Sequence, residues 1–460
     1  MGQLIRQPNT TLILSKSAPP ATLSGTGAFA NLATLAPNPG IVPFAPNVSF
    51  WSDYAEKSRW FTVPNINDKI TFSADGHWTF PTGMVWVKHF DLPNERTNPA
   101  GPSRRIETRF LVKTADSIFG LTYQWREDQT EADLVGNDGA DAFYTVLVKG
   151  EPTLQRWHYP ARYECLQCHA PVANHSLGFN TRQMNASHIY GAQTLNQIQA
   201  LSDAGYFTAP VSGVNGLPAL AKASDTSQSL EWRVRSYFAA NCVQCHQPGG
   251  ASNANWDARP TTPTDSAEMI NGMLNYVGND PTNRFVVAGQ PSHSMALLRL
   301  AGKEPRMPPI STTELDPGAI RLLQDWITES LPTRLSFPQW QTRYFGSAEN
   351  PDAAAAADPD RDGQINLQEF LAYTEPILAS SAFPLPEGST SEGGSGVRFQ
   401  FSQPPNRAVL VETSTNLTNW TLWDVPGNSP TYPAATESRT IIAPADGDRH
   451  RAFRLRLSAP

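Results

Sequence analysis

The sequence is poor in cysteine, in charge and in long apolar runs. Charged residues make up 17% of the 460 residues, and 35 Lys and Arg stand against 42 Asp and Glu. Because phosphate binding needs a concentrated basic surface, nucleic acid is not an expected partner. No apolar run approaches the roughly 20 residues that cross a bilayer, so we expect no membrane span. The 40% of hydrophobic residues nevertheless suffice for a folded protein rather than a disordered one.

All four cysteines lie in two matching pentapeptides, so none is left for a disulfide elsewhere. The pattern C-x-x-C-H is typical of c-type haem attachment, in which both thiols form thioethers and the histidine binds the iron. Two intervening residues place both sulfurs on one side of a helical turn. The sequence therefore predicts two covalently bound haem c groups, attached at Cys165, Cys168, Cys242 and Cys245 and held by His169 and His246 as proximal ligands.

Three other interpretations compete with haem attachment. The two C-x-x-C pairs could form a four-thiolate zinc site, although zinc ribbons usually place the pairs about 15 to 20 residues apart. A thioredoxin-like redox pair would need a parallel βαβ setting, and neither motif has one. Unrelated buried thiols would not both be followed by a histidine.

Haem attachment also predicts where the protein works. Thioether formation is completed outside the bacterial cytoplasm, so we expect a periplasmic or extracellular protein. The N-terminus, MGQLIRQPNTTLILSK, lacks the continuous apolar stretch of a secretory signal. We therefore expect a missing leader, a misassigned start or a fragment of a larger exported chain.

Methionines are the candidates for the distal haem ligands. Met307 lies 61 residues beyond His246, in the Pro-rich segment Arg306-Met307-Pro308-Pro309, and a thioether is a suitable ligand for haem iron. For the first haem we favour Met184, while His158, His175 and His188 are further candidates. If none of the four binds the iron, the first haem is five-coordinate and open to a small molecule or a peroxide.

A calcium site is predicted near the C-terminal end. Residues 358–369 fit the full D-x-D-x-D-G-x5-E calcium loop, in which Gly363 permits the sharp turn and Glu369 binds with both oxygens. The alternative is a solvated acidic loop. We expect a structural rather than a sensing role, with these candidate ligands: Asp358, Asp360, Asp362, Gln364, Asn366 and Glu369.

Strand-like and helical patterns divide the chain. Its 40 prolines exceed the roughly 23 expected from average usage, which favours loops, turns and strand edges. Alternating runs predict a β-rich, sandwich-like N-terminal domain and a C-terminal β-sandwich, and helical spacing before Cys242 and after Asp316 predicts a mainly α, cytochrome c-like dihaem region. The expected segments are 1–160 (β-rich), 161–228 (first haem), 229–335 (second haem), 336–377 (EF-hand-like) and 378–460 (linker and β-sandwich).

Nine segments in matching order resemble a family of bacterial dihaem c-type cytochromes, which occur alone or fused to sugar-dehydrogenase-like β-propellers. They are FWSDYAEKSRW (50–60), FPTGMVWVKHF (80–90), ETRFLV (107–112), YQWREDQTEADLV (123–135), WHYPARYECLQCH (157–169), LGFNTRQMN (177–185), NCVQCHQPGG (241–250), AGQPSHSMALLRL (288–300) and RMPP (306–309). The resemblance covers about residues 20 to 332. It implies an exported electron carrier with the haem ligands named above; the tail from about 350 resembles the appendages of other exported bacterial proteins.

These patterns together predict one-electron transfer between a dehydrogenase or quinol-linked donor and a downstream acceptor, which could be another cytochrome. The first alternative is a dihaem peroxidase or oxidase, in which the haem at Cys165–His169 is open and catalytic. The second is an interaction module, in which the β-domains dock the protein to a partner and the haems are secondary.

Overall fold

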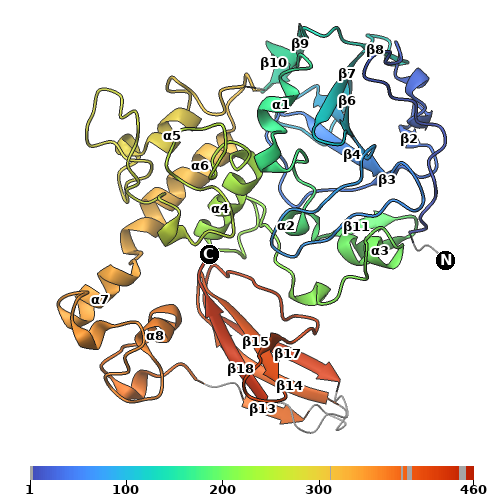
Figure 1. Ribbon diagram of the computed structural model, residues 1–460. Coiled ribbons are helices and arrows are strands. Elements are labelled where there is room, and N and C mark those ends of the chain that lie inside the picture. The colour runs from blue at the N-terminus through green and yellow to red at the C-terminus, as the bar shows by residue number, and fades with distance from the viewer. Residues whose placement is uncertain (1–3, 311, 385–386, 391–395, 445–451) are drawn as a thin grey trace. The chain divides into compact units, whose positions relative to one another are not determined.

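The computed structural model describes residues 4–310, 312–384, 387–390, 396–444 and 452–460 (Figure 1). The chain forms two compact units, each assembled from three stretches. Unit 1 consists of residues 1–211, 240–253 and 299–317, and unit 2 of residues 212–239, 254–298 and 318–460. Within the described ranges, none of the helices combines the length and apolar character that a membrane crossing requires. The division into five sequential segments stays a prediction.

Unit 1 is built on a six-stranded antiparallel sheet with the order β3-β4-β5-β6-β7-β8. Aromatic and β-branched residues, which favour extended backbone, recur along its long strands. The strands are β3 (Val42–Pro43), β4 (Glu56–Thr62), β5 (Val85–Pro93), β6 (Ser103–Lys113), β7 (Ile118–Trp125) and β8 (Ala132–Leu134).

One face of this sheet carries the main hydrophobic core of unit 1. Residues of β4 to β8 that alternate along the strands pack there against the N-terminal segment, and most are below 9% exposed. This core contains Leu23, Ala28, Phe29, Ile41, Trp60, Val85, Val87, Phe110, Val112, Leu121, Tyr123, Trp125 and Ala132. The opposite face is different, because Arg59, Lys88 and Arg109 stand there in adjacent register positions on β4, β5 and β6.

Short elements complete unit 1. A long antiparallel ribbon, β9 (Ala140–Val148) with β10 (Glu151–Tyr159), leads into the first cysteine motif. Trp157 and Tyr159 of β10 are buried in a second hydrophobic cluster. The other elements are β1 (Phe29–Asn31), β2 (Ala36–Pro37), α1 (Cys165–Cys168), α2 (Thr181–Met184), β11 (Ser187–Tyr190), β12 (Gln193–Asn196) and α3 (Gln197–Asp203).

Unit 2 combines helices with a C-terminal β-structure. Two three-stranded antiparallel sheets, β13-β14-β17 and β16-β15-β18, share a core that includes Phe399, Val409, Trp423 and Ile441. These strands are β13 (Glu387–Thr390), β14 (Gly396–Gln403), β15 (Ala408–Ser414), β16 (Thr421–Leu422), β17 (Glu437–Pro444) and β18 (Ala452–Ser458). Residues 385–386 and 391–395 of the predicted linker lie outside the described residues.

The helices occupy the middle of the sequence and the calcium region. α4 (Leu230–Asn241) runs into the second cysteine motif, α5 (Met295–Leu300) precedes the Met307 segment, and α6 (Pro317–Asp325) continues as a π-turn to Ser330. α7 (Phe337–Phe345) begins with a capping box at Ser336, and α8 (Asn366–Ala372) follows the predicted calcium loop.

The prediction of a mainly α, cytochrome c-like dihaem region is wrong. The structure is mostly β-sheet, and only 20% of it is helical. Among the described residues of 161–335, only α4 and α6 are α-helices of eight or more residues. They are the two runs with clear helical spacing, whereas prolines such as Pro171 and Pro291 begin single 3-10 turns that end at once. The two cysteine motifs therefore lie on short turns held by loops.

Candidate functional site

The first cysteine motif is a single helical turn at the end of the β9–β10 ribbon. His158 of β10 holds it in place: its Nε2 lies 2.9 Å from Glu164 Oε2 and its Nδ1 lies 2.9 Å from Asp141 Oδ1. Glu164 also accepts the Ala161 N–H at 2.7 Å. The Cys165 sulfur lies against the backbone of Gly120 on β7, where a side chain larger than hydrogen would meet it.

His169 is prepared to act as a metal ligand. Its Nδ1 lies 2.7 Å from the His175 carbonyl, and because a carbonyl only accepts, Nδ1 carries the proton. Burial lowers the pKa of His169 to about 4, so the ring is neutral and Nε2 keeps a lone pair. A hydrogen bond from the other ring nitrogen to a carbonyl is the usual arrangement of a metal-ligating histidine.

The second motif is a turn of the same kind directly after α4. The N–H groups of Cys245 and His246 both donate to the Cys242 carbonyl, at 3.1 and 2.9 Å. Asn241, the last residue of α4, accepts the Trp51 N–H with its side-chain oxygen at 2.7 Å. Burial, and secondly the charge of the Arg299 guanidinium, lowers the pKa of His246 to about 4, so this ring too is neutral.

Both motifs belong to unit 1 and lie close together. The pKa of Cys168 is raised to about 11, first by burial and second by the charge of Cys245, so these two thiols are within electrostatic reach of each other. Burial also raises the pKa of Cys242 to about 12. Attachment at both motifs would place two haems in one compact unit.

The four thiols do not favour the zinc and redox alternatives. Catalytic C-x-x-C cysteines need depressed pKa values, whereas burial raises the pKa of all four thiols here. Within the described residues, the only group of at least three Cys, His, Asp or Glu ligand atoms within 4.8 Å of one another is in the acidic loop at 358–362. The sheet beside the first motif is antiparallel rather than βαβ. The thiol spacing and the neutral, anchored His169 fit thioether-bound haem.

The candidate distal ligands have different surroundings. Met307 is half-buried, and its N–H donates to the carbonyl of Arg299, the residue whose charge reaches His246. Met184 is fully buried at the end of α2. The side chain of the preceding Gln183 accepts the Val48 N–H and donates to the Val48 carbonyl. Their ligand roles stay predictions.

The three candidate histidines are used differently. Both ring nitrogens of His158 face carboxylates, and Nδ1 of His175 bonds the His169 carbonyl at 2.9 Å. These interactions hold the first motif together and leave His158 without a nitrogen for iron. His188 on β11 packs its ring edge-on against Tyr190.

The predicted calcium loop lies in unit 2. Gly363 has φ +93° and donates its N–H to Asp358 at 3.1 Å, which closes the turn that this loop requires. Ligand oxygens of Asp358, Asp360 and Asp362 lie within 4.8 Å of one another.

Two further oxygens point to a cation. Asn366 and Glu369 are completely buried, yet Asn366 Oδ1 and Glu369 Oε2 have no hydrogen-bond partner. Burial and then Asp360 and Asp362 raise the pKa of Glu369 to about 7, because a further negative charge is unfavourable beside theirs. Both polar atoms of the Gln364 side chain instead form hydrogen bonds with the backbone of Phe383, at 3.0 Å each. Only the backbone carbonyl of Gln364 is therefore left to bind a cation.

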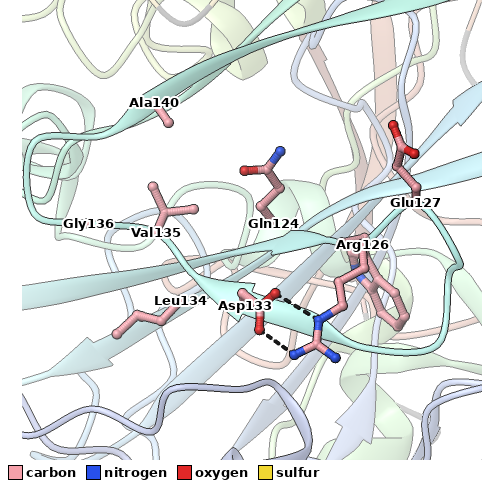
Figure 2. Close-up of a pocket in the computed structure, with 9 residues that line it drawn as sticks. Gln124, Arg126, Glu127, Asp133, Leu134, Val135, Gly136 and Ala140 are labelled. Carbon is pink, nitrogen blue, oxygen red and sulfur yellow. Dashed lines mark hydrogen bonds and ion pairs between the residues drawn. The ribbon is translucent and has the colours of Figure 1, made fainter.

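A recess of about 430 Å³ lies elsewhere in unit 1, between β7, β8 and the start of β9. Figure 2 shows that Arg126 and Asp133 pair there with two hydrogen bonds, at 2.8 and 2.7 Å. None of the predicted haem or calcium residues lines it. Its one cation is neutralised in this way, and Glu127 is the other charged residue of the lining.

Sequence reasoning missed the basic residues on the second face of the sheet. Lys57, Arg59, Lys88 and Arg109 lie near the first motif, and the charges of Lys88 and Arg109 act on both Cys168 and His169. The sequence does contain a signal for them: basic residues stand at alternate positions inside strand-like runs, and residues two apart on a strand share a face.

Comparison with known protein families, with curated proteins and with solved structures finds no match to this chain.

Proposed function

We propose that the protein is an exported dihaem electron carrier of the bacterial c-type cytochrome family that the sequence resembles. The supporting observation is the pairing of two C-x-x-C-H turns within one compact unit, with Cys168 and Cys245 in electrostatic reach of each other. Haem supplies one-electron chemistry when bound. Two such groups attached side by side would exchange electrons directly.

The protein's own contribution is to hold each imidazole and to control its environment. At the first motif, the His175 carbonyl fixes the orientation of His169, and a hydrogen bond of this kind makes a ligand more basic. At the second motif, Arg299 places a positive charge near His246. Different charges and hydrogen bonds at the two sites favour two different reduction potentials, which would set a direction for electron flow.

The cofactor chemistry also suggests the location and the partners. Because thioethers form outside the bacterial cytoplasm, we place the protein in the periplasm or beyond it. The donor would be a dehydrogenase or quinol-linked enzyme, and the acceptor another redox protein such as a cytochrome. No substrate pocket is needed for this role.

The proposal is tested by expression with haem-maturation machinery. We expect two iron atoms per chain, and two haem-bearing peptides, 165–169 and 242–246. Replacing His169 by alanine should alter the spectrum of one haem and leave the other intact. A chain that stays colourless, or that binds zinc instead, would refute the proposal.

One observation favours a second candidate, an enzyme with an open first haem. Both ring nitrogens of His158 are committed to carboxylates, so one of the four candidate sixth ligands is occupied. Cyanide binding by the ferric protein, or rapid peroxide turnover, would support the enzyme. Spectra that neither reagent changes would leave electron transfer alone.

We further propose that the loop at 358–369 binds one structural Ca²⁺. The buried and unpartnered oxygens of Asn366 and Glu369 support this, since unpaired buried oxygens are unfavourable unless a cation joins them.

A further inference from the structure

Four basic residues occupy one face of the unit 1 sheet beside the first cysteine motif. Arg59 on β4 stands opposite Lys88 on β5, and Lys88 stands opposite Arg109 on β6. Lys57 lies two residues before Arg59 and shares its face. This cationic row is half-buried rather than solvated, so its charges must be compensated from within the protein or by a ligand.

Only one end of the row is neutralised. Arg109 forms a two-pronged ion pair with Glu107, which is fully buried and also accepts the Trp157 indole N–H at 2.9 Å. The Lys57 ammonium donates to the Phe50 carbonyl at 2.7 Å.

In the described part of the chain, the other cations make no direct contact with a carboxylate, and Glu56, Asp53 and Glu107 act on them only at longer range. The Lys88 ammonium lies 5.0 Å from the ring centre of Phe90 and 5.7 Å from that of Phe50. Among the residues described, no carboxylate forms an ion pair with Lys57, Arg59 or Lys88. Burial lowers the pKa of Lys57 to about 7, with a contribution from the neighbouring Arg59, and burial lowers that of Arg59 to about 10 even though Glu56 opposes it. Three neighbouring half-buried cations that no carboxylate contacts directly point to an anion that the polypeptide does not supply.

The place of the row relative to the thiols limits what that anion can be. Cys165 lies against β7, and the charges of Lys88 and Arg109 reach the Cys168 thiol. Three strand spacings of about 4.8 Å separate β7 from β4. The far end of the row, at Arg59 on β4, therefore lies about 14 Å from the strand that Cys165 contacts. This span is similar to the extent of a haem from its thioether edge to its two propionates.

We propose that Lys57, Arg59 and Lys88 bind the propionate carboxylates of the haem attached at Cys165 and Cys168. The inference rests on the proposed function. The basic row is thus a positioning device: it fixes the far edge of a haem whose near edge is bound covalently. It also places positive charge beside that haem, which favours the ferrous state.

The test uses the haem-loaded full chain. Arg59→Gln and Lys88→Gln each remove a charge at nearly constant size, Lys88→Arg keeps the charge, and Arg104→Gln removes an exposed charge from the same sheet as a control. The readouts are the midpoint potentials of the two haems and the propionate bending bands in the resonance Raman spectrum.

We expect each glutamine variant to lower one potential by about a tenfold change in the ferric-to-ferrous ratio, which is 59 mV for one electron. One propionate band should shift as well, while Lys88→Arg and Arg104→Gln resemble the wild type. Two attached haems with unchanged potentials and bands in both glutamine variants would overturn the assignment. If one variant fails to fold, Lys57→Gln replaces it in the same comparison.

Two further outcomes separate this inference from its premise. Succinate or phosphate added to the wild type should leave both potentials unchanged, because the propionates fill the site. A saturable shift would show that a free anion binds the row instead and would contradict the assignment. A wild type that carries no haem at the first motif would refute the proposed function, and the assignment with it.

Discussion

The contact between Gly120 and Cys165 gives a sharp prediction. In Gly120→Ala the new methyl group would meet the Cys165 sulfur, and the β7 backbone and α1 must move apart. Overpacking of this kind costs about 1–3 kcal/mol. Since about 2–4 °C of melting temperature corresponds to each kcal/mol in a domain of this size, we expect a loss of several degrees.

Gly136→Ala is the matched control, because an added methyl group there meets no heavy atom within 4 Å. We expect it to leave stability unchanged or to raise it by about 0.4–1 kcal/mol through the unfolded state. Thermal melts of the haem-loaded variants, with the mass of the peptide containing Cys165, measure both stability and attachment. If Gly120→Ala melts with the wild type and carries haem at full occupancy, the packing of the first motif against β7 is wrong.

Three further predictions concern charge. Arg334→Met leaves the buried Glu231 without its 2.8 Å ion pair and should cost about 3–5 kcal/mol in chemical denaturation, whereas the exposed Arg321→Met should cost no more than about 1 kcal/mol. Millimolar Ca²⁺ should raise the melting temperature of the wild type but not that of Glu369→Gln. Without Ca²⁺ the variant should be at least as stable as the wild type, since it loses a buried repulsive charge. Equal responses of the two proteins to Ca²⁺ would refute the site. Burial lowers the pKa of His158, but its bonds to Glu164 and Asp141 outweigh this and raise it above 6.5. The stability that protonated His158 contributes is complete below pH 6.5 and is lost as the pH rises through its folded-state pKa. The wild type should therefore lose more stability than His158→Asn between about pH 6 and 9. Parallel stability profiles of the two proteins would exclude this contribution.

Local signals predicted local structure. The apolar spacing before Cys242 produced α4, and Pro317 begins α6, because both helices depend on residues within a few turns. The strand-like runs around Trp60 and Trp86 lie in β4 and β5, and both indoles are 7% exposed. Such patterns need no knowledge of distant partners.

The mainly α region was mispredicted because two helices were extended into a whole fold. What lies between them is fixed by contacts far apart in the sequence, such as Thr313 with Asp53. The candidate site shows the same limit. The spacing of Cys165, Cys168 and His169 predicts a haem motif, but only the fold reveals that His175 anchors the imidazole or that the charge of Lys88 acts on it.

The most direct test of the account is to mature the chain in an exporting host and to determine, by mass spectrometry, what is bound to each cysteine motif. We predict one haem mass on the peptide containing Cys165 and Cys168 and one on the peptide containing Cys242 and Cys245, with two iron atoms per chain. Free thiols at either motif, or zinc in place of iron, would contradict it.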